Sequence, residues 1–176
     1  KVFRGFSYDV PRGPCALTIG NFDGVHRGHM VLLAQLREAA DRLHLPAAVL
    51  TFSPHPRQYF AFQSNKSVTA PATITPLREK IQALSQCGVD QVTIAHFDHL
   101  TASLTAEQFI EQILVKSLGV KWLIIGEKFR FGKGRLGTTD MLKEAGKKYG
   151  FHVEILPAVN DENGRISSSC IRKALE

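Results

Sequence analysis

Two histidines stand close together in a glycine-punctuated stretch, Gly-Asn-Phe-Asp-Gly-Val-His-Arg-Gly-His, at residues 20–29. His26 and His29 are three residues apart, so they project from one side of the first turn if a helix begins here. Gly28, between them, lets the backbone lie close to a ligand. Backbone N–H groups at a helix start favour an anion such as phosphate. The stretch therefore predicts a site in which both histidines hold a nucleotide phosphate during phosphoryl or nucleotidyl transfer.

Two other interpretations of this turn stay open. Each histidine could make only a local bond at the start of its helix, which is the commoner role of an isolated histidine. His26, His29 and Asp23 could also hold a metal ion, but three ligands would have to converge and no Glu stands in a His-Glu-x-x-His frame. The preceding apolar run and the two glycines favour phosphate, so no metal site is predicted.

A second phosphate-binding pattern lies at residues 165–172, Arg-Ile-Ser-Ser-Ser-Cys-Ile-Arg. Serines at a helix start offer hydroxyls and free N–H groups, and the arginine fork matches the geometry of a phosphate. We therefore expect Arg165, Ser168, Ser169 and Arg172 to cradle a diphosphate. The alternative is that the serines only cap a helix.

A loop stiffened by two prolines lies at residues 51–57. It contains Phe52, Pro54, His55 and Arg57, and it follows an apolar run. Such a loop places an aromatic ring, an imidazole and a cation beside the first site. X-Pro loops are common, so this pattern carries little weight alone.

A basic, glycine-rich loop occupies residues 126–137. It is not a Walker A loop, because its first glycine stands six residues before the Gly-Lys pair instead of five, and a glycine follows where Ser or Thr is needed. Phe129 and Phe131 alternate with cations that include Lys128 and Arg135. This pattern is suited to a flat, phosphorylated ligand. The alternative is a solvated basic loop with one core phenylalanine.

Short apolar runs alternate with stretches of helical periodicity along the chain. The expected strands lie at residues 15–19, 47–52, 89–97, 120–125 and 151–156. The alternation predicts a Rossmann-like, doubly wound parallel sheet of about five strands with helices on both faces. Ligands of such α/β sheets bind at the carboxyl ends of the strands, near the point where the strand order reverses. All the unusual loops follow strands, so we expect them at one edge.

Several boundaries can also be predicted. Residues 11–14 are expected to form a loop just before the first strand, and residues 57–73 an excursion over the sheet edge that includes a short helix. Thr75 is expected to cap a helix with proline at its first position, and Thr105 with Gln108 to form a capping box. Another helix is expected to start near Ile166.

The composition is that of one globular domain spanning residues 1–176. The net charge of +6 suits a polyanionic ligand, but the basic residues are scattered, so neither a nucleic-acid nor a membrane partner is expected. An RNA-binding protein would instead show a steep salt dependence of affinity. Three widely spaced cysteines and the absence of a signal-peptide pattern favour a cytoplasmic protein.

Together the four blocks resemble the adenylyltransferase module of the prokaryotic bifunctional riboflavin kinase/FAD synthetase family. The resemblance covers essentially the whole chain. It rests on the motifs Gly-Asn-Phe-Asp-Gly-Val-His-x-Gly-His at 20–29, Thr-Phe-x-Pro-His-Pro at 51–56, Phe-Arg-Phe-Gly-Lys-x-Arg-x-Gly at 129–137 and Arg-Ile-Ser-Ser-x-x-Ile-Arg at 165–172. His-x-Gly-His alone indicates only the broad nucleotidylyltransferase superfamily, and the other blocks narrow it to the flavin type.

The resemblance implies that AMP is transferred from MgATP to FMN, giving FAD and pyrophosphate. His26, His29 and Arg172 would be the catalytic residues, and Mg²⁺ would be held mainly through the substrate phosphates. The remaining ATP-binding residues would be Gly20, Asn21, Gly28, Arg165, Ser168 and Ser169. The flavin would be bordered by Phe52, Pro54, His55, Arg57, Lys128, Phe129, Phe131 and Arg135. No general base is needed, because the FMN phosphate is already anionic.

One departure and three alternatives accompany this expectation. Lys128 stands where the family commonly has Asp or Asn. The family usually carries a C-terminal riboflavin kinase domain, which we expect in the full-length chain and not in these 176 residues. The acceptor could instead be nicotinate mononucleotide or a pantetheine phosphate, or the chain could be a flavin- or nucleotide-binding module without catalysis.

Overall fold

A six-stranded, all-parallel sheet forms the centre of the computed structural model, which describes residues 1–7, 9, 12–63, 75–157, 160–161 and 164–165. Its strands are β1 (Val2–Arg4), β2 (Cys15–Ile19), β3 (Ala47–Ser53), β4 (Gln91–His96), β5 (Val120–Gly126) and β6 (His152–Leu156). The two-residue strands β7 (Asn160–Asp161) and β8 (Gly164–Arg165) pair separately and antiparallel. The predicted Rossmann-like class is confirmed, with one strand more than the five that the sequence indicated.

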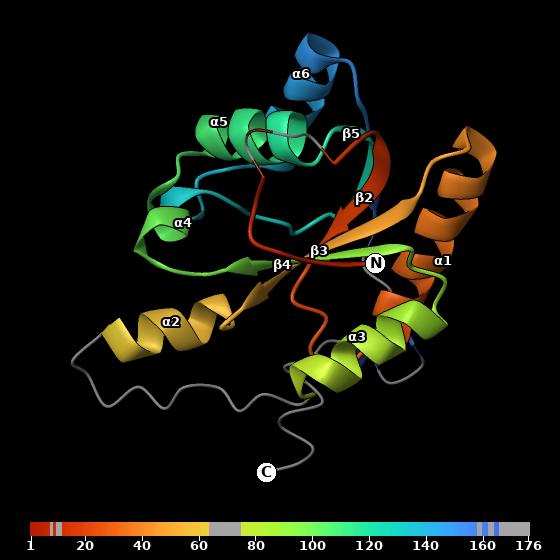
Figure 1. Ribbon diagram of the computed structural model, residues 1–176, viewed down its shortest axis with the longest axis horizontal. Coiled ribbons are helices and arrows are strands. Elements are labelled where there is room, and N and C mark those ends of the chain that lie inside the picture. Colours follow the sequence, from red (N-terminus) through yellow and green to blue (C-terminus); the bar gives the residue numbers. More distant parts are fainter. Residues whose placement is uncertain (8, 10–11, 64–74, 158–159, 162–163, 166–176) are drawn as a thin grey trace.

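Helices cover both faces of the sheet (Figure 1). They are α1 (Arg27–Leu43), α2 (Pro56–Gln63), α3 (Leu77–Gln86), α4 (His99–Ser103), α5 (Ala106–Gln108) with its π-helical continuation η1 (Phe109–Ser117), the 3₁₀ turn η2 (Lys133–Arg135) and α6 (Thr139–Tyr149). Helices α1 and α3 pack on one face, and α5, η1 and α6 on the other. None of the described helices combines the length and apolarity that a membrane crossing requires.

The strands read as continuous apolar runs because they are buried on both faces. In β2, Cys15, Leu17 and Ile19 join the core beneath η1 and α6, whereas Ala16 joins the core beneath α1 and α3. Period-two alternation therefore sends successive apolar side chains to two different cores. Burial on both faces fixes the position of each strand end, and with it the loop that follows.

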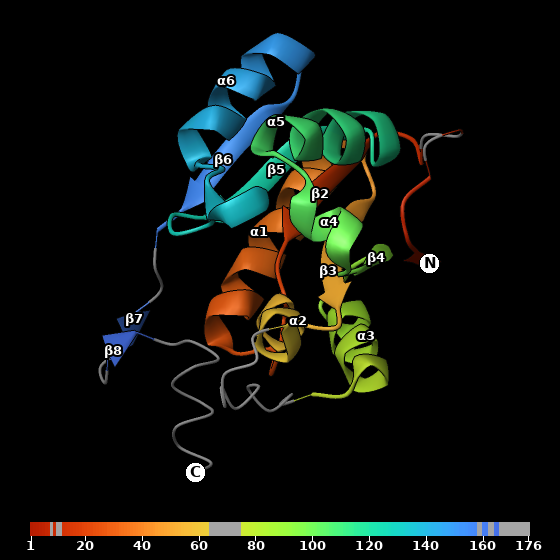
Figure 2. The same ribbon diagram turned by 90° about the vertical axis from the view of Figure 1, so that its left-hand side faces the viewer.

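The strand order β1-β4-β3-β2-β5-β6 reverses at β2. Figure 2 shows β6, β5, β2, β3 and β4 in succession across the sheet. The chain moves from β2 outward to β3 and β4, and then returns to place β5 on the other side of β2. The turn that contains the two histidines therefore leaves the sheet at its switch point, where α/β proteins bind ligands.

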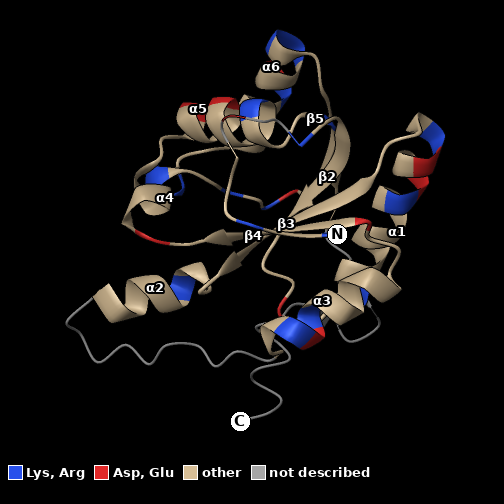
Figure 3. Cartoon of the chain, viewed as in Figure 1, with Lys and Arg blue, Asp and Glu red and all other residues tan. Residues whose placement is uncertain are grey.

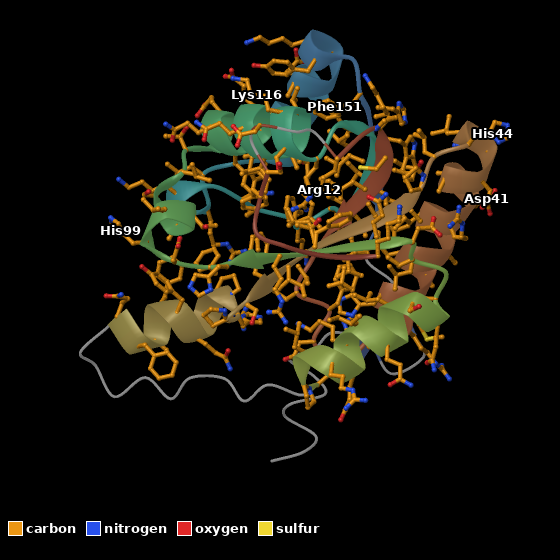
Figure 4. The ribbon with its side chains drawn as sticks, in the orientation of Figure 1. Arg12, Asp41, His44, His99, Lys116 and Phe151 are labelled. Atoms are coloured by element: carbon orange, nitrogen blue, oxygen red, sulfur yellow. The ribbon has the colours of Figure 1, made fainter. Side chains whose placement is uncertain are left out.

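Strand β1 was not predicted, because the sequence indicated no strand before residue 15. It pairs with β4, and Arg12, labelled in Figure 4, fastens the segment to the sheet. The Arg12 guanidinium donates to Thr93 Oγ1 and to the Gly5 carbonyl, each at 2.6 Å, and lies 4.5 Å from the centre of the Phe3 ring. Three residues are too few to show a strand period, so only the long-range pairing defines this strand.

Of the two helix caps predicted from the sequence, one is present and one is not. The capping box of Thr105 and Gln108 is present, as predicted. Thr75 does not cap α3, which lacks a side-chain cap. Its hydroxyl instead accepts the Gly24 N–H at 3.0 Å. The short helix predicted after residue 57 is α2, whereas residues 64–74 and the helix expected from Ile166 lie outside the described residues.

Candidate functional site

The two histidines form a stacked pair at the start of α1. His26 is the N-cap residue, and its Nδ1 accepts the backbone N–H of His29 at 3.3 Å. The imidazole rings are 3.7 Å apart and inclined by 17°. Because Nδ1 of His26 accepts a hydrogen bond, its ring proton is assigned to Nε2. His26 can therefore donate through Nε2–H to a ligand oxygen bound at the helix start.

His29 is the more buried member of this pair. Its ring lies 4.9 Å from that of Phe22, and its Nδ1 is buried without a hydrogen-bond partner among the described residues. Burial, followed by the charge of His26, lowers the pKa of His29 to about 3, although Asp23 raises it. Burial also lowers the pKa of His26. At pH 7 both imidazoles are neutral in the unliganded protein, so they offer hydrogen bonds rather than full positive charges.

The turn before the histidines is tightly packed. Phe22 is fully buried with a positive φ of 48°, which non-glycine residues adopt rarely. A Cβ on Gly20 would lie 2.9 Å from the Phe22 ring, so a side chain there would displace that ring. Thr51 Oγ1 donates to the Asn21 carbonyl at 3.2 Å and joins the turn to β3. Packing against Phe22 therefore accounts for a glycine at position 20, in addition to the ligand-binding role that the sequence predicts.

A cavity of about 540 Å³ opens beside this turn, at the carboxyl ends of β2, β3, β4 and β5. This confirms that the loops after β2, β3 and β5 gather at one edge. Its lining consists of Gly20, Asn21, Phe52, His55, Pro56, Arg57, Phe60, Phe97, Thr101, Ala102, Phe109, Lys128, Phe129, Arg130, Phe131, Gly132, Gly134 and Arg135. Gly20 and Asn21 belong to both the turn and the cavity, so the turn borders this space through its first two residues, whereas His26 and His29 are not in the lining.

Aromatic rings line the cavity from two sides. Phe97, directly after β4, contacts the rings of Phe52 and Phe60 at 5.7 and 5.8 Å between centroids. From the loop after β5, Phe129 stacks on Phe131 at 5.7 Å and 17°. Two aromatic walls suit a flat ring system, because aromatic rings stack or meet edge to face at such separations.

The rim of the cavity is basic. Arg57, Lys128, Arg130 and Arg135 are exposed cations in its lining, and the described lining residues include no Asp or Glu. Figure 3 shows basic residues at the start of α2 and on η2 beside α4. An aromatic interior with a cationic rim favours a ligand that is flat and negatively charged.

Glycines and backbone bonds hold the basic loop in place. Lys133 N–H donates to the Leu104 carbonyl at 2.7 Å, which joins η2 to the segment before α5. A Cβ on Gly132 would lie 2.8 Å from the backbone nitrogen of Ala106, and its φ is +72°. Phe131 and Gly137 exchange two backbone hydrogen bonds. The loop is thus folded against α5, which points Phe131 into the core and leaves the cations exposed.

The structure brings together most of the predicted acceptor residues. Phe52, His55, Arg57, Lys128, Phe129, Phe131 and Arg135 all line the cavity, whereas Pro54 does not. The side chain of Arg165 and all of Ser168, Ser169 and Arg172 lie outside the described residues. The convergence of the serine–arginine segment with the histidine turn therefore stays a prediction.

Sequence reasoning missed several lining residues. Phe97 follows a strand directly, so its position at a carboxyl end was the available signal. Phe109, the first residue of η1, is buried in the core and also borders the cavity. Thr101 and Ala102 lie on α4, a five-residue helix that the sequence did not indicate. No sequence pattern relates these residues to the loop after β5.

The described residues contain no group of three or more His, Cys, Asp and Glu side chains that could hold a metal ion. Asp23 does not extend the histidine pair into such a group. Its carboxylate is buried and accepts the Thr75 N–H at 3.1 Å.

The parallel sheet, with a His-x-Gly-His turn at its switch point and a cavity beside that turn, is that of a Rossmann-like α/β protein. Residues 10–170 match the family described as FAD synthetase. The chain is 45% identical over 177 residues to the bifunctional riboflavin kinase/FMN adenylyltransferase of Escherichia coli K12, covering 99% of this chain and 55% of the relative. It is 49% identical over 161 residues to the protein of that description from Haemophilus influenzae, covering 92% and 51%.

Solved structures agree on the fold. A Streptococcus pneumoniae protein described as a macrolide-efflux protein superposes with a TM-score of 0.81 at 28% identity, covering 99% of this chain and 57% of that one. A pantoate–β-alanine ligase from Francisella tularensis superposes with a TM-score of 0.55 at 13% identity, covering 97% and 73%, and supports the fold alone.

The chain belongs to the FAD synthetase family, a family of nucleotidyltransferases. It spans about half the length of the curated relatives it matches.

Proposed function

We propose that this chain transfers AMP from MgATP to FMN and releases FAD and pyrophosphate. The observation that carries the proposal is the aromatic, cation-rimmed cavity that opens directly beside the histidine turn at the switch point of the sheet. The cavity is suited to a flavin phosphate, and the turn is suited to a triphosphate. Family membership supports the same reaction.

In the proposed reaction, a phosphate oxygen of FMN attacks the α-phosphorus of ATP. The new bond joins that oxygen to the α-phosphorus, and the bond from the α-phosphorus to the bridging oxygen breaks, so pyrophosphate leaves with its electron pair. No proton has to be removed, because the attacking oxygen is already anionic. Catalysis then depends on alignment and on hydrogen-bond donors where negative charge builds up.

We assign the binding of the transferred phosphate to the histidine turn and the binding of the flavin to the cavity. His26 would donate through Nε2–H, and His29 through whichever ring nitrogen is protonated, to oxygens of the transferred phosphate. The rings of Phe97 and Phe129 would hold the isoalloxazine system. Arg165, Ser168, Ser169 and Arg172 are proposed to hold the leaving diphosphate, a role that rests on the sequence pattern alone. Mg²⁺ is proposed to arrive on the ATP phosphates.

The longer relatives are named for a riboflavin kinase activity as well as for FMN adenylyltransferase activity. We propose that a kinase domain accompanies this one in the full-length protein and supplies FMN. The cytoplasmic location expected from the sequence also stays a prediction.

The test compares acceptors under identical conditions. The protein is mixed with MgATP and with FMN, riboflavin, nicotinate mononucleotide or pantetheine phosphate, and pyrophosphate release is followed. We expect FMN to be the best acceptor, with FAD formed in equal amount. Faster release with another phosphate acceptor would overturn the assignment of FMN. Binding of FMN and ATP without any pyrophosphate release would instead indicate a non-catalytic module.

A further inference from the structure

A buried lysine lies on α3, the helix whose preceding segment is hydrogen-bonded to the histidine turn. Lys80 is 6% exposed, although lysine is among the residues least often buried. Its backbone belongs to the first turns of α3, whose N-terminal end lies close to the chain that descends from β2 (Figure 1). Burying an ammonium group is costly unless an opposite charge compensates it. A nearby negative charge is therefore expected to compensate the charge of Lys80.

Asp23 supplies the compensating charge. It is 3% exposed and stands in the histidine turn, three residues before His26. Burial lowers the pKa of Lys80, and the charge of Asp23 raises it. The same two groups act on the pKa of His29 in opposite directions, since Asp23 raises it and Lys80 lowers it. Asp23, Lys80 and His29 therefore form one electrostatic cluster.

Hydrogen bonds join the turn to the start of α3 as well. Asp23 Oδ1 accepts the Thr75 N–H at 3.1 Å, and Thr75 Oγ1 accepts the Gly24 N–H at 3.0 Å. These two bonds run in opposite directions between the same two segments. They tie the histidine turn to the segment that leads into α3, the helix on which Lys80 lies.

A buried carboxylate so close to the histidines presents a problem for a phosphate site. Asp23 interacts electrostatically with His29, and neither imidazole is protonated at pH 7. In a poorly solvated site a negative charge repels an incoming triphosphate strongly. A cation that neutralises Asp23 removes this repulsion without occupying the place of the ligand.

We propose that Lys80 is a positioning residue of the nucleotide site, which neutralises Asp23 in the histidine turn so that the turn accepts a triphosphate. The inference rests on the proposed function for the identity of the ligand. Lys80 acts through Asp23, and the histidines remain the groups that touch the phosphates. The pair also keeps the turn docked on α3.

The test measures binding of a non-hydrolysable ATP analogue and of adenosine to Lys80→Met, Asp23→Asn and the double variant, by calorimetry. Methionine keeps the length of the apolar stem, and asparagine keeps the oxygen that accepts the Thr75 N–H. Lys143→Met, at an exposed site on α6, serves as the matched control. No acceptor is present, so the result does not depend on whether FMN is the substrate.

For Lys80→Met we expect triphosphate binding about 10- to 100-fold weaker, with adenosine binding unchanged, because only the charged ligand meets the uncompensated carboxylate. The double variant should recover to within about 3-fold of the parent, since the carboxylate is gone. Asp23→Asn alone should bind the analogue at least as tightly as the parent.

Two results would overturn the proposal. If the double variant binds as weakly as Lys80→Met, Lys80 acts on the ligand directly or through the fold. If Asp23→Asn alone weakens binding of the analogue by about 10-fold, the carboxylate is not a repulsive group that needs compensation. If Lys80→Met does not fold, the proposal is still tested by the binding of the ATP analogue to Asp23→Asn and to the double variant. Failure to form FAD from MgATP and FMN would affect the proposed function and leave this binding test intact.

Discussion

The histidine turn and the aromatic cavity are adjacent, but they are built differently. In the turn, Phe22 is fully buried and Asp23 is nearly so, and hydrogen bonds join the segment to β3 and to Thr75, which precedes α3. The cavity has exposed cations at its rim and is formed by loops from several strand ends. The reacting phosphate needs fixed donors, whereas a flat acceptor can be held by area and general charge. The difference predicts that changes in the turn affect the chemical step and changes in the cavity affect acceptor affinity.

The largest effect is expected for His29→Ala. Removing one donor to a charge that develops in the transition state typically costs about 10²- to 10³-fold in rate. We expect a loss of this size in FAD formation, with little change in FMN affinity measured by fluorescence quenching. His152→Ala, at an exposed site on β6, is the control. An unchanged rate would remove His29 from the catalytic group.

The acid stability of the protein should depend on His29. Its pKa is about 3 in the folded state and near 6.5 when unfolded, so between these values the unfolded chain binds a proton that the folded chain excludes. The contribution of this residue is complete above pH 6.5 and is lost as the pH falls toward 3. From pH 6.5 to 4.5 we expect a loss of about 2–3 kcal/mol in the free energy of unfolding.

Urea denaturation at several pH values measures this loss. The pH range ends at 4.5 so that other groups contribute little to the change in stability. The pKa values of Asp90 and Asp98 are lowered in the folded state, so the stability that these carboxylates contribute is lost at lower pH. His29→Gln cannot titrate, so its stability should change less over the same window. Equal slopes for the parent and the variant would contradict the buried neutral state of His29.

In the cavity, Phe97→Ala should weaken FMN binding by about 10- to 30-fold, because a well-placed aromatic ring contributes on the order of 1–3 kcal/mol through buried area and ring contacts. The KM for ATP should stay within about 2-fold. Phe62→Ala is the matched control, since Phe62 is 80% exposed on α2 and does not line the cavity. A parallel rise in both KM values would argue against separate acceptor and nucleotide regions.

The smallest effect is expected for Lys128→Asn, which introduces a residue common in the family at this position. Lys128 is exposed, and exposed charge pairs contribute about 0–1 kcal/mol. FMN affinity should fall by no more than about 5-fold at low salt, and the difference should shrink at high salt. Riboflavin binding, which lacks the phosphate charge, should not change. An equal loss for riboflavin would show that Lys128 contacts the ring system.

Most of the architecture could be predicted from local signals. Period-two and period-3.6 patterns extend over a few residues and are set by neighbouring side chains, so they indicated the five longer strands and the main helices. Glycine spacing and the position of loops after strands predicted where the two regions meet. The π-helical winding of η1 was not predicted; its buried side chains include Phe109, Ile110, Ile113 and Leu114.

By itself, the sequence determined the His-x-Gly-His turn, the basic aromatic loop and the alternation that makes a parallel sheet. Only the tertiary structure brought Phe97 beside Phe52, placed Lys80 within the electrostatic influence of Asp23, and gave Thr75 a role in holding Gly24 instead of capping a helix. These pairs are separated by more than 40 residues in the chain. Their contacts follow from the strand order and from the docking of α3, which no local pattern of apolar and polar residues encodes.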